Sequence, residues 1–444
     1  MKFINMIKSK LNLTNNKYRV MQNIYWAMIG KFVKVFTEFL VGIFVARYLG
    51  PEQYGLMNYV ISFVTIFSII ATFGLDDIEI RELAKNQENK NKILGTSFRL
   101  RIYFALLTLG LISLTLYITK TESATSLLIL IYTISIIFST LNVVKNYFIS
   151  IVLNKYIVLT EIIRCLIGAA IKVILLLLHA DLIWFIISLA FDFMLLATGY
   201  YTAYKHKIGE IKKWYYDIPT AKLLIKESFP LLLSGTAIII YQKIDQIMIY
   251  EMIDDGALGL FSVANSLTGF ALFVPTIIAQ TITPILVDLH NKNHDVYKDR
   301  IQQFIDYMLW SSIAFSIILG FVAYLIPYIY GKEYTNAIIV LQILSWKLVG
   351  SSLSSASGQL IILEGIQRYA VIRNIIGCII CISLNFLLIP IFGINGAAIS
   401  AVITVIFSGY LSNYIIKPYR KIFMIQSKSF VYGFKNIILQ FVKK

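Results

Sequence analysis

Long apolar runs separated by short polar breaks constrain this sequence more than any other feature. A helix of about 20 apolar residues crosses the hydrocarbon core of a bilayer, and the sequence contains twelve such runs. We therefore predict an all-α polytopic membrane protein with about 12 transmembrane helices in two six-helix lobes around a central cavity. The predicted spans are residues 22–46, 56–75, 100–119, 124–146, 157–178, 182–204, 229–250, 258–286, 307–330, 336–363, 370–391 and 394–416.

The composition excludes a water-soluble enzyme. Of the 444 residues, 58% are hydrophobic and only 14% are charged, whereas about 25% are charged in an average soluble protein. No polar stretch is long enough for an extramembrane domain. The chain also lacks the glycine-rich loop that would bind the phosphates of ATP. We expect a transporter with no catalytic residues, no metal site and no cofactor.

The distribution of basic residues predicts the orientation. The net charge of +16 could indicate nucleic-acid binding, but basic residues of membrane proteins concentrate in cytoplasmic segments. With the N-terminus inside, 31 Lys and Arg residues fall on the inner side, and only Arg47, Lys120 and Lys332 fall outside. We therefore expect both termini in the cytoplasm and no nucleic-acid partner.

A long basic loop, residues 205–228, divides the spans into six and six. We predict an N-terminal lobe over residues 1–217, a C-terminal lobe over 218–417 and a basic amphipathic cytoplasmic tail over 418–444. The tail either lies on anionic lipid or is a frayed end. A weak repeat supports the two halves, because Tyr54-Gly55 and Leu258-Gly259 each open an even-numbered span.

Ten charged residues fall inside the predicted spans and away from their ends. Each costs about 2.5 to 3.5 kcal/mol at the centre of a bilayer, so they should face one another or a wet cavity. The cations are Lys31, Lys34, Arg164, Lys172, Lys243 and Lys347, and the anions are Glu38, Glu161, Asp192 and Asp245.

Helical spacing places most of these charges in one-sided polar stripes, as in a cavity lining. At about 100° per residue, Lys31, Lys34 and Glu38 share a face, as do Glu161, Arg164, Gly168 and Lys172. A third stripe contains Lys347, Ser351, Ser354 and Gly358. Span 7 groups Ser234, Tyr241 and Asp245, with Lys243 on the other side. The alternative is that these side chains join helices or reach the interface near span ends.

The excess of cations over anions indicates an anionic substrate group, such as a phosphate. Glu38, Asp192 and Asp245 are candidates for binding a proton or Na⁺ in a coupled transport cycle. A simpler interpretation of Glu38 is an ion pair with Lys34, four residues earlier on the same helix.

Four motifs in order resemble those of bacterial polysaccharide (O-antigen) flippases, which belong to the multidrug/oligosaccharidyl-lipid/polysaccharide exporter superfamily. They are Arg47 to Gly55, Phe73-Gly74-Leu75 with Ile80 to Ala84, Gly331-Lys332-Glu333-Tyr334, and Asn385 to Pro390 with Gly393 and Gly396.

The resemblance implies a flippase for an undecaprenyl-diphosphate-linked oligosaccharide, an O-antigen or capsule repeat unit, in the bacterial inner membrane. It further implies alternating access, proton or Na⁺ coupling, contact with membrane lipid, and a polysaccharide polymerase and a chain-length regulator as partners. The substrate-binding candidates are then Lys31, Lys34, Arg47, Arg164, Lys172, Lys243 and Lys347, and the coupling candidates are Glu38, Asp192 and Asp245.

Two alternatives remain open. A drug or cation exporter of the same superfamily would have an acidic cleft. A membrane polysaccharide polymerase or glycosyltransferase would need a large external region, which the short predicted outer loops do not provide.

Overall fold

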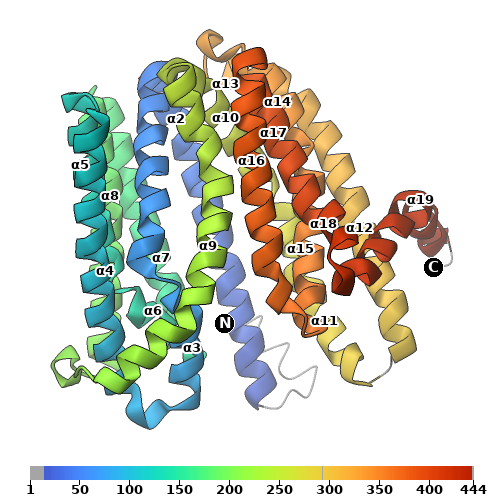
Figure 1. The fold of residues 1–444 in the computed structure, drawn as a ribbon, viewed down its shortest axis with the longest axis horizontal. Helices are drawn as coiled ribbons and strands as arrows, with labels where there is room; N and C mark the ends of the chain where they lie inside the picture. Colours follow the sequence, from blue (N-terminus) through green and yellow to red (C-terminus); the bar gives the residue numbers. More distant parts are fainter. Residues whose placement is uncertain (1–14, 293, 443–444) are drawn as a thin grey trace. The chain divides into compact units, whose positions relative to one another are not determined.

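A computed structural model describes residues 15–292 and 294–442, and every regular element within them is helical (Figure 1). The chain divides into two units. The first contains Met1–Tyr48 and Phe63–Gly235, and the second contains Leu49–Ser62 and Thr236–Lys444. The division falls inside helix α9 (Ile218–Met252), whereas the sequence suggested a boundary at residue 217.

Ten helical stretches of the described chain are long and apolar enough to cross a membrane. The first, Ile29–Lys85, covers the first two predicted spans. The fifth predicted span forms α7 (Asn154–Leu177), which is not among the ten. The chain is therefore a multi-pass membrane protein, as predicted, and the count of twelve spans stays a prediction.

A sharp kink separates the first two predicted spans within α2 (Asn15–Thr72). Gly50 has φ 70° and ψ 174°, and Pro51 follows it. Glycine adopts a positive φ without a steric penalty, and proline favours the first turn of a new helix. The kink lies at the point where the chain passes from the first unit to the second.

The first unit is built from long helices that run side by side, and α8 packs along both α5 and α7. Its core includes Leu94, Val144, Phe148 and Tyr204. After α2 its helices are α3 (Leu75–Lys85), α4 (Lys90–Thr119), α5 (Ser123–Ser139), α6 (Asn142–Ser150), α7, α8 (Leu182–Lys207) and the start of α9, with short turns at Gln87–Asn89 and Ile211–Lys213.

A buried ion cluster joins α3, α4 and α6 at one end of this unit. Arg101, only 1% exposed, donates from Nε to Glu79 at 2.8 Å and from Nη2 to Asp76 at 2.6 Å. Asn146 donates to both carboxylates, at 2.8 and 2.7 Å. Arg101 is one of the 31 basic residues that the sequence assigns to the inner side, because it stands at the end of a predicted span.

The second unit contains the remaining helices, with a core formed by α11, α12, α15 and the start of α19. They are α10 (Asp255–Ala271), α11 (Phe273–Lys292), α12 (His294–Val322), α13 (Ile326–Ile329), α14 (Ala337–Ser345), α15 (Lys347–Leu363), α16 (Ala370–Phe392), α17 (Ile394–Ile406), a π-helical turn at Phe407–Leu411, α18 (Ser412–Ile415) and α19 (Arg420–Val442), with short 3₁₀ turns at Ala323–Leu325, Lys332–Tyr334, Gln367–Tyr369 and Lys417–Tyr419.

The C-terminal tail forms helix α19, which packs along α12. Ser429 lies 2.5 Å from Asp306, and Gln426 donates to Ser357 of α15 at 2.8 Å. The basic side chains Lys421 and Lys428 are exposed, together with apolar side chains such as Met424 and Val431. The tail is thus a helix that packs against the second unit, and its contact with anionic lipid remains a prediction.

The second unit contains both glycines of the predicted repeat, Gly55 and Gly259. Each lies against the backbone of the helical segment that carries the other. A Cβ atom on Gly259 would lie 2.0 Å from the carbonyl oxygen of Pro51, and one on Gly55 would lie 1.8 Å from that of Asp255. Only glycine at both positions allows the backbones to approach this closely.

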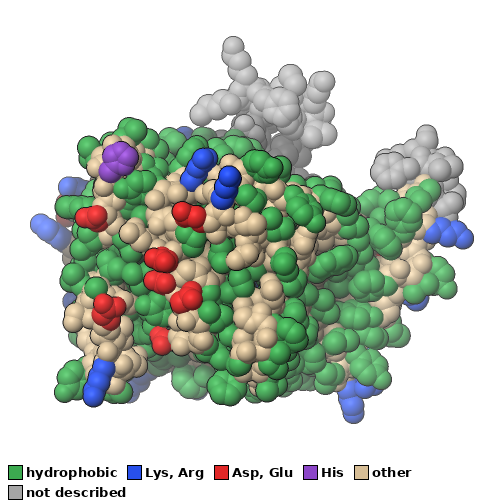
Figure 2. Space-filling view, turned by 90° about the horizontal axis from the view of Figure 1, so that it is seen from above, with side chains coloured by type: hydrophobic (Ala, Val, Ile, Leu, Met, Phe, Trp, Pro, Cys, Tyr) green, Lys and Arg blue, Asp and Glu red, His purple; other side chains and the backbone are tan. Residues whose placement is uncertain are grey.

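Large hydrophobic side chains cover much of the molecular surface. Examples are Tyr117, Leu177, Phe321 and Phe386, each more than 60% exposed. In Figure 2 hydrophobic side chains form most of the visible surface, and charged groups occupy small separate patches. Such a surface is suited to acyl chains rather than to water.

Replacing Gly259 with Ala should destabilise the second unit, because the added methyl group overlaps the Pro51 carbonyl. We expect a loss of about 1–3 kcal/mol, as for other overpacked sites. Thermal unfolding in detergent can be followed with a thiol-reactive dye, since Cys165 and Cys381 are buried free thiols.

Gly320→Ala is the matched control, since a Cβ atom there would meet nothing within 4 Å. The control should be neutral or slightly stabilising, because Ala favours helix by up to about 1 kcal/mol over Gly. Equal melting temperatures for the two variants would contradict the close approach.

Candidate substrate cavity

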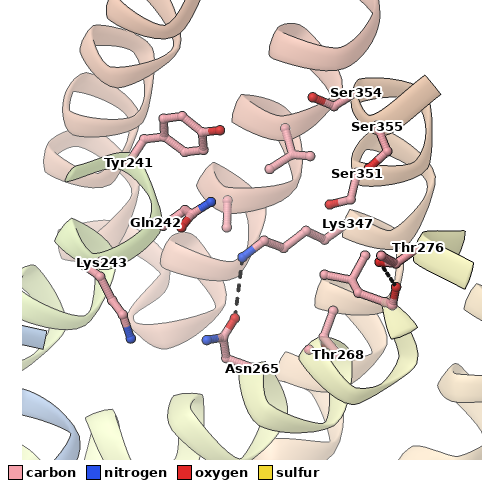
Figure 3. Close-up of a pocket in the computed structure, with 14 residues that line it drawn as sticks. Tyr241, Gln242, Lys243, Asn265, Thr268, Thr276, Lys347, Ser351, Ser354 and Ser355 are labelled. Carbon is pink, nitrogen blue, oxygen red and sulfur yellow. Dashed lines mark hydrogen bonds between the residues drawn. The ribbon is translucent and has the colours of Figure 1, made fainter. Parts of the chain in front are cut away.

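The second unit contains a polar cavity of about 460 Å³ enclosed by α9, α10, α11, α15 and α17. Fourteen residues line it, and the ten with polar side chains are labelled in Figure 3. Small residues at the wall, Gly269 and Ala401, leave the space open. None of the lining residues carries a carboxylate.

Two lysines line this cavity, Lys243 from α9 and Lys347 from α15. The Nζ atom of Lys347 donates to Oδ1 of Asn265 at 3.4 Å, a long hydrogen bond (Figure 3). Among the described residues, neither ammonium lies within ion-pair distance of a carboxylate. The cavity wall therefore carries an excess of positive charge, because two ammonium groups stand against the single carboxylate of Asp245, which acts on them from outside the lining.

Helical periodicity explains the lining contributed by α15. Lys347, Ser351 and Ser354 are spaced by four and three residues and so share one helix face, and all three line the cavity. Gly358, which belongs to the same predicted stripe, is not part of the lining. Ser355, one residue beyond Ser354, adds a further hydroxyl.

The arrangement on α9 differs from the sequence prediction. Helical spacing places Lys243 on a different side of α9 from Tyr241 and Asp245. In the structure, however, Tyr241 and Lys243 both line the cavity. Both side chains are long, so they reach the same space from different sides of the helix. Asp245 instead is 1% exposed and accepts the backbone N–H of Gln246 at 2.8 Å.

Asp245 lies just behind the cavity wall. Lys347 and Lys243 both act on it electrostatically, although neither forms a close ion pair with it. The buried thiol of Cys381 is also near Asp245 and accepts a hydrogen bond from Asn385 at 3.4 Å. Oδ1 of Asn385 is buried and has no hydrogen-bond partner among the described residues.

In the first unit, the charges of α7 are paired. Arg164 donates to Glu38 at 3.0 Å and lies 3.8 Å from Asp192, and Lys172 donates to Asp192 at 2.8 Å. Gly168 makes room for this carboxylate, since a Cβ atom there would lie 2.1 Å from it. Arg164 and Lys172 thus join helices, which is one of the two interpretations that the sequence left open.

Apart from Glu38, the remaining charged candidates of the first unit lie outside this network. Glu38 pairs with Arg164 and not with Lys34. Lys31 and Lys34 are partly buried on α2, and Arg47 is exposed near the kink. Glu161 lies 3.6 Å from Lys145. In the part of the chain that the structure describes, Lys31, Lys34 and Arg47 have no ion-pair partner.

Sequence patterns did not identify the neutral lining residues Gln242, Asn265 and Thr268. Each stands beside or near other polar residues of an otherwise apolar span, and such polar side chains also join helices. Only the fold, which brings α9 and α10 to one cavity, shows that these three residues face the same space.

The comparisons with known proteins agree with this architecture. The sequence profile of a family described as polysaccharide biosynthesis protein matches residues 20–290, which is more than half of the chain. The chain belongs to this family. The recognition of this class of exporters from four short motifs is therefore confirmed.

Solved structures share the fold along nearly the whole chain. Lipid II flippase MurJ, in an inward closed conformation, superposes with a TM-score of 0.68 at 17% identity, over 94% of this chain and 93% of that chain. An inward-facing MATE family multidrug resistance transporter of the MOP superfamily gives a TM-score of 0.67 at 14% identity, over 89% and 96%. These similarities confirm the all-α transporter fold. No curated protein matches the sequence.

Two substitutions should separate the paired charges from the unpaired ones. Arg164→Met removes the ion-pair partner of Glu38 and leaves Asp192 with Lys172 alone, so it should cost about 3–5 kcal/mol, as when other buried ion pairs are broken. Lys243→Met removes an unpaired ammonium and should leave the melting temperature unchanged or raise it. Thermal unfolding of both variants in the same detergent checks this contrast, and a larger loss for Lys243→Met would refute it.

Proposed function

We propose that this protein is a flippase that moves an undecaprenyl-diphosphate-linked oligosaccharide, an O-antigen or capsule repeat unit, across the bacterial inner membrane by alternating access. The observation that supports this most directly is the pair of ammonium groups, Lys243 and Lys347, at a cavity without carboxylates. A diphosphate supplies the missing negative charge, and its attraction is strong where the walls exclude water.

The lining suits a glycosylated headgroup. Lysine binds phosphate as a flexible point charge, and the hydroxyls of Ser351, Ser354 and Ser355 can exchange hydrogen bonds with sugar hydroxyls. The polyprenyl chain would lie against the apolar outer surface, in contact with membrane lipid. The substrate crosses unchanged, so this proposal requires no catalytic residue and no cofactor.

The cavity chemistry disfavours a drug or cation exporter. Such a protein would present carboxylates to its substrate, but Lys243 and Lys347 are the charged groups of this lining. A polymerase or glycosyltransferase would need an extramembrane catalytic region, and the chain has no polar stretch of that length.

The basic residues support the proposed orientation, with both termini in the cytoplasm and 31 Lys and Arg residues on that side. In this location the protein would deliver its substrate to the outer leaflet. A polysaccharide polymerase and a chain-length regulator would then use the product, so we propose them as functional partners.

We further propose that transport is ion-coupled through Asp245, which binds a proton or Na⁺. Asp245 is buried beside the cavity wall, and both lysines act on it. Its charge state would therefore change the attraction between the cavity and an anion. Glu38 and Asp192 are less suited to coupling, because their ion pairs with Arg164 and Lys172 would have to break.

Replacing Lys243 or Lys347 with Ala should reduce transport. One charge-assisted contact contributes about 1.5–3 kcal/mol, or roughly a ten- to hundredfold change in affinity. The measurement is the movement of a fluorescent lipid-linked oligosaccharide between leaflets of proteoliposomes.

Lys120→Ala is the control, because Lys120 is exposed at the end of α4 and carries the same charge. The variants Lys243→Arg and Lys347→Arg should each retain part of the activity, since arginine keeps the positive charge. Full activity in the Lys243→Ala/Lys347→Ala double variant would disprove the role of the cavity.

Asp245→Asn preserves the shape of the side chain but removes its charge and its ability to take up a proton. We expect this variant to lose the response of transport to an imposed proton or Na⁺ gradient while it still binds substrate. Glu122→Gln, at an exposed helix start, controls for the loss of one acid. A gradient response equal to that of the wild type would exclude Asp245 as the coupling site.

A further inference from the structure

Arg373 is a partly buried cation that the proposed mechanism does not yet use. It is the fourth residue of α16, and its Nε and Nη1 atoms are buried without a hydrogen-bond partner among the described residues. No carboxylate in residues 15–292 and 294–442 lies within ion-pair distance of it. Arg373 is another of the 31 basic residues that the sequence assigns to the inner side.

The neighbours of Arg373 connect it to the cavity. Tyr241 and Tyr419 are the titratable groups that act on its guanidinium electrostatically. Tyr241 lines the cavity (Figure 3). The Tyr419 hydroxyl donates to the backbone oxygen of Ile366 at 3.3 Å. Arg373 is therefore near the lining residue Tyr241, although it is not itself among the lining residues.

Arg373 and the two lysines lie at different levels of the second unit. Cys381 of α16 donates to the backbone oxygen of Tyr241 at 3.6 Å. Because Arg373 precedes Cys381 by eight residues, its Cα lies about 12 Å from the Cα of Cys381 along the helix axis. In Figure 3 the ammonium of Lys347 points to Asn265, and Tyr241 and Ser354 lie at the opposite end of the view. Tyr241 thus lies between Arg373 and the lysine pair.

An unpaired buried guanidinium destabilises a folded protein. An arginine near a helix end can place its head group in water, but burial of Nε and Nη1 shows that this side chain does so incompletely. A ligand that supplies acceptor oxygens would satisfy these donors. Phosphate is the anion whose oxygens suit the planar donor set of arginine best.

We propose that Arg373 is a second anion-binding position, which holds a phosphate group of the substrate at the end of the cavity where α16 begins, separate from the position at Lys243 and Lys347. The identity of the lipid carrier rests on the proposed function, whereas the preference for a phosphate anion rests on the geometry. The substrate headgroup would pass between the two positions along Tyr241 during transport.

The test is calorimetric titration of the protein in nanodiscs with inorganic pyrophosphate. The wild type should show two binding events, and Arg373→Gln and the Lys243→Ala/Lys347→Ala double variant should show one each. The remaining event should be lost, with a decrease in affinity of about tenfold or more, when all three substitutions are combined.

Arg368→Gln is the matched control. Arg368 is exposed five residues earlier and stacks on Tyr369 at 4.7 Å, so this substitution changes the net charge equally without touching the proposed position. The proposal would be overturned if Arg373→Gln and Arg368→Gln bound both probes, pyrophosphate and farnesyl diphosphate, equally well. A repeat with farnesyl diphosphate identifies the source of the anion. If only the prenylated probe distinguishes Arg373→Gln, the position serves lipid-linked headgroups, and if both probes do, it also accepts free anions.

A stability measurement distinguishes binding from a structural role. Arg373→Met should raise the melting temperature without ligand and should reduce the stabilisation that pyrophosphate gives to the wild type. A structural arginine would give the opposite result, a lower melting temperature with an unchanged ligand effect.

The two proposals can fail separately. If wild-type protein binds pyrophosphate at two positions but does not move lipid-linked oligosaccharide, the proposed function is wrong and the second position stands. If it moves the lipid and Arg373→Gln behaves like Arg368→Gln, the second position is wrong and the function stands.

Discussion

The cost of placing charge in hydrocarbon governs how this molecule is organised. The two units meet that cost in different ways. In the first, Arg101 and Arg164 are held by carboxylates of neighbouring helices, so the charges serve packing. In the second, Lys243 and Lys347 line a cavity without a carboxylate and form no close ion pair among the described residues, although the buried Asp245 acts on both. This excess of positive charge is the reason that we propose the cavity as the anion site.

Close packing around that charge depends on small residues. Gly259 lets α10 approach the segment after Pro51, and Gly269 and Ala401 keep the cavity wall thin. These residues contribute no chemistry of their own. They set the helix spacing at which side chains from α9, α10 and α15 meet in one space, because helices with large side chains at these contacts would stand farther apart.

The sequence predicted the helical class, the superfamily and the serine face of α15, because each follows from a repeated pattern along a single helix. It failed where the outcome depends on which helix lies opposite. Arg164 pairs with Glu38, 126 positions earlier, and spacing within α7 cannot show this. Lys243 was placed away from Tyr241, because an ideal helical angle ignores the reach of long side chains. Arg101 and Arg373 were missed, since a charge near a span end looks like a loop charge until its burial is known.

A transport site must also release what it binds, and the partners of the two lysines fit this requirement. Lys347 has one long hydrogen bond to a neutral amide, so exchanging this bond for a phosphate oxygen, and reversing the exchange, involves no separation of opposite charges. Arg164 could take up an anion only by breaking its contacts with Glu38 and Asp192, and breaking such an ion pair costs up to several kcal/mol where the groups are buried. The same physical rule makes the paired charges of the first unit rigid and the lysines of the second unit exchangeable. It therefore favours the lysine pair, rather than the paired charges of the first unit, as the place where we propose that a substrate anion is bound and released.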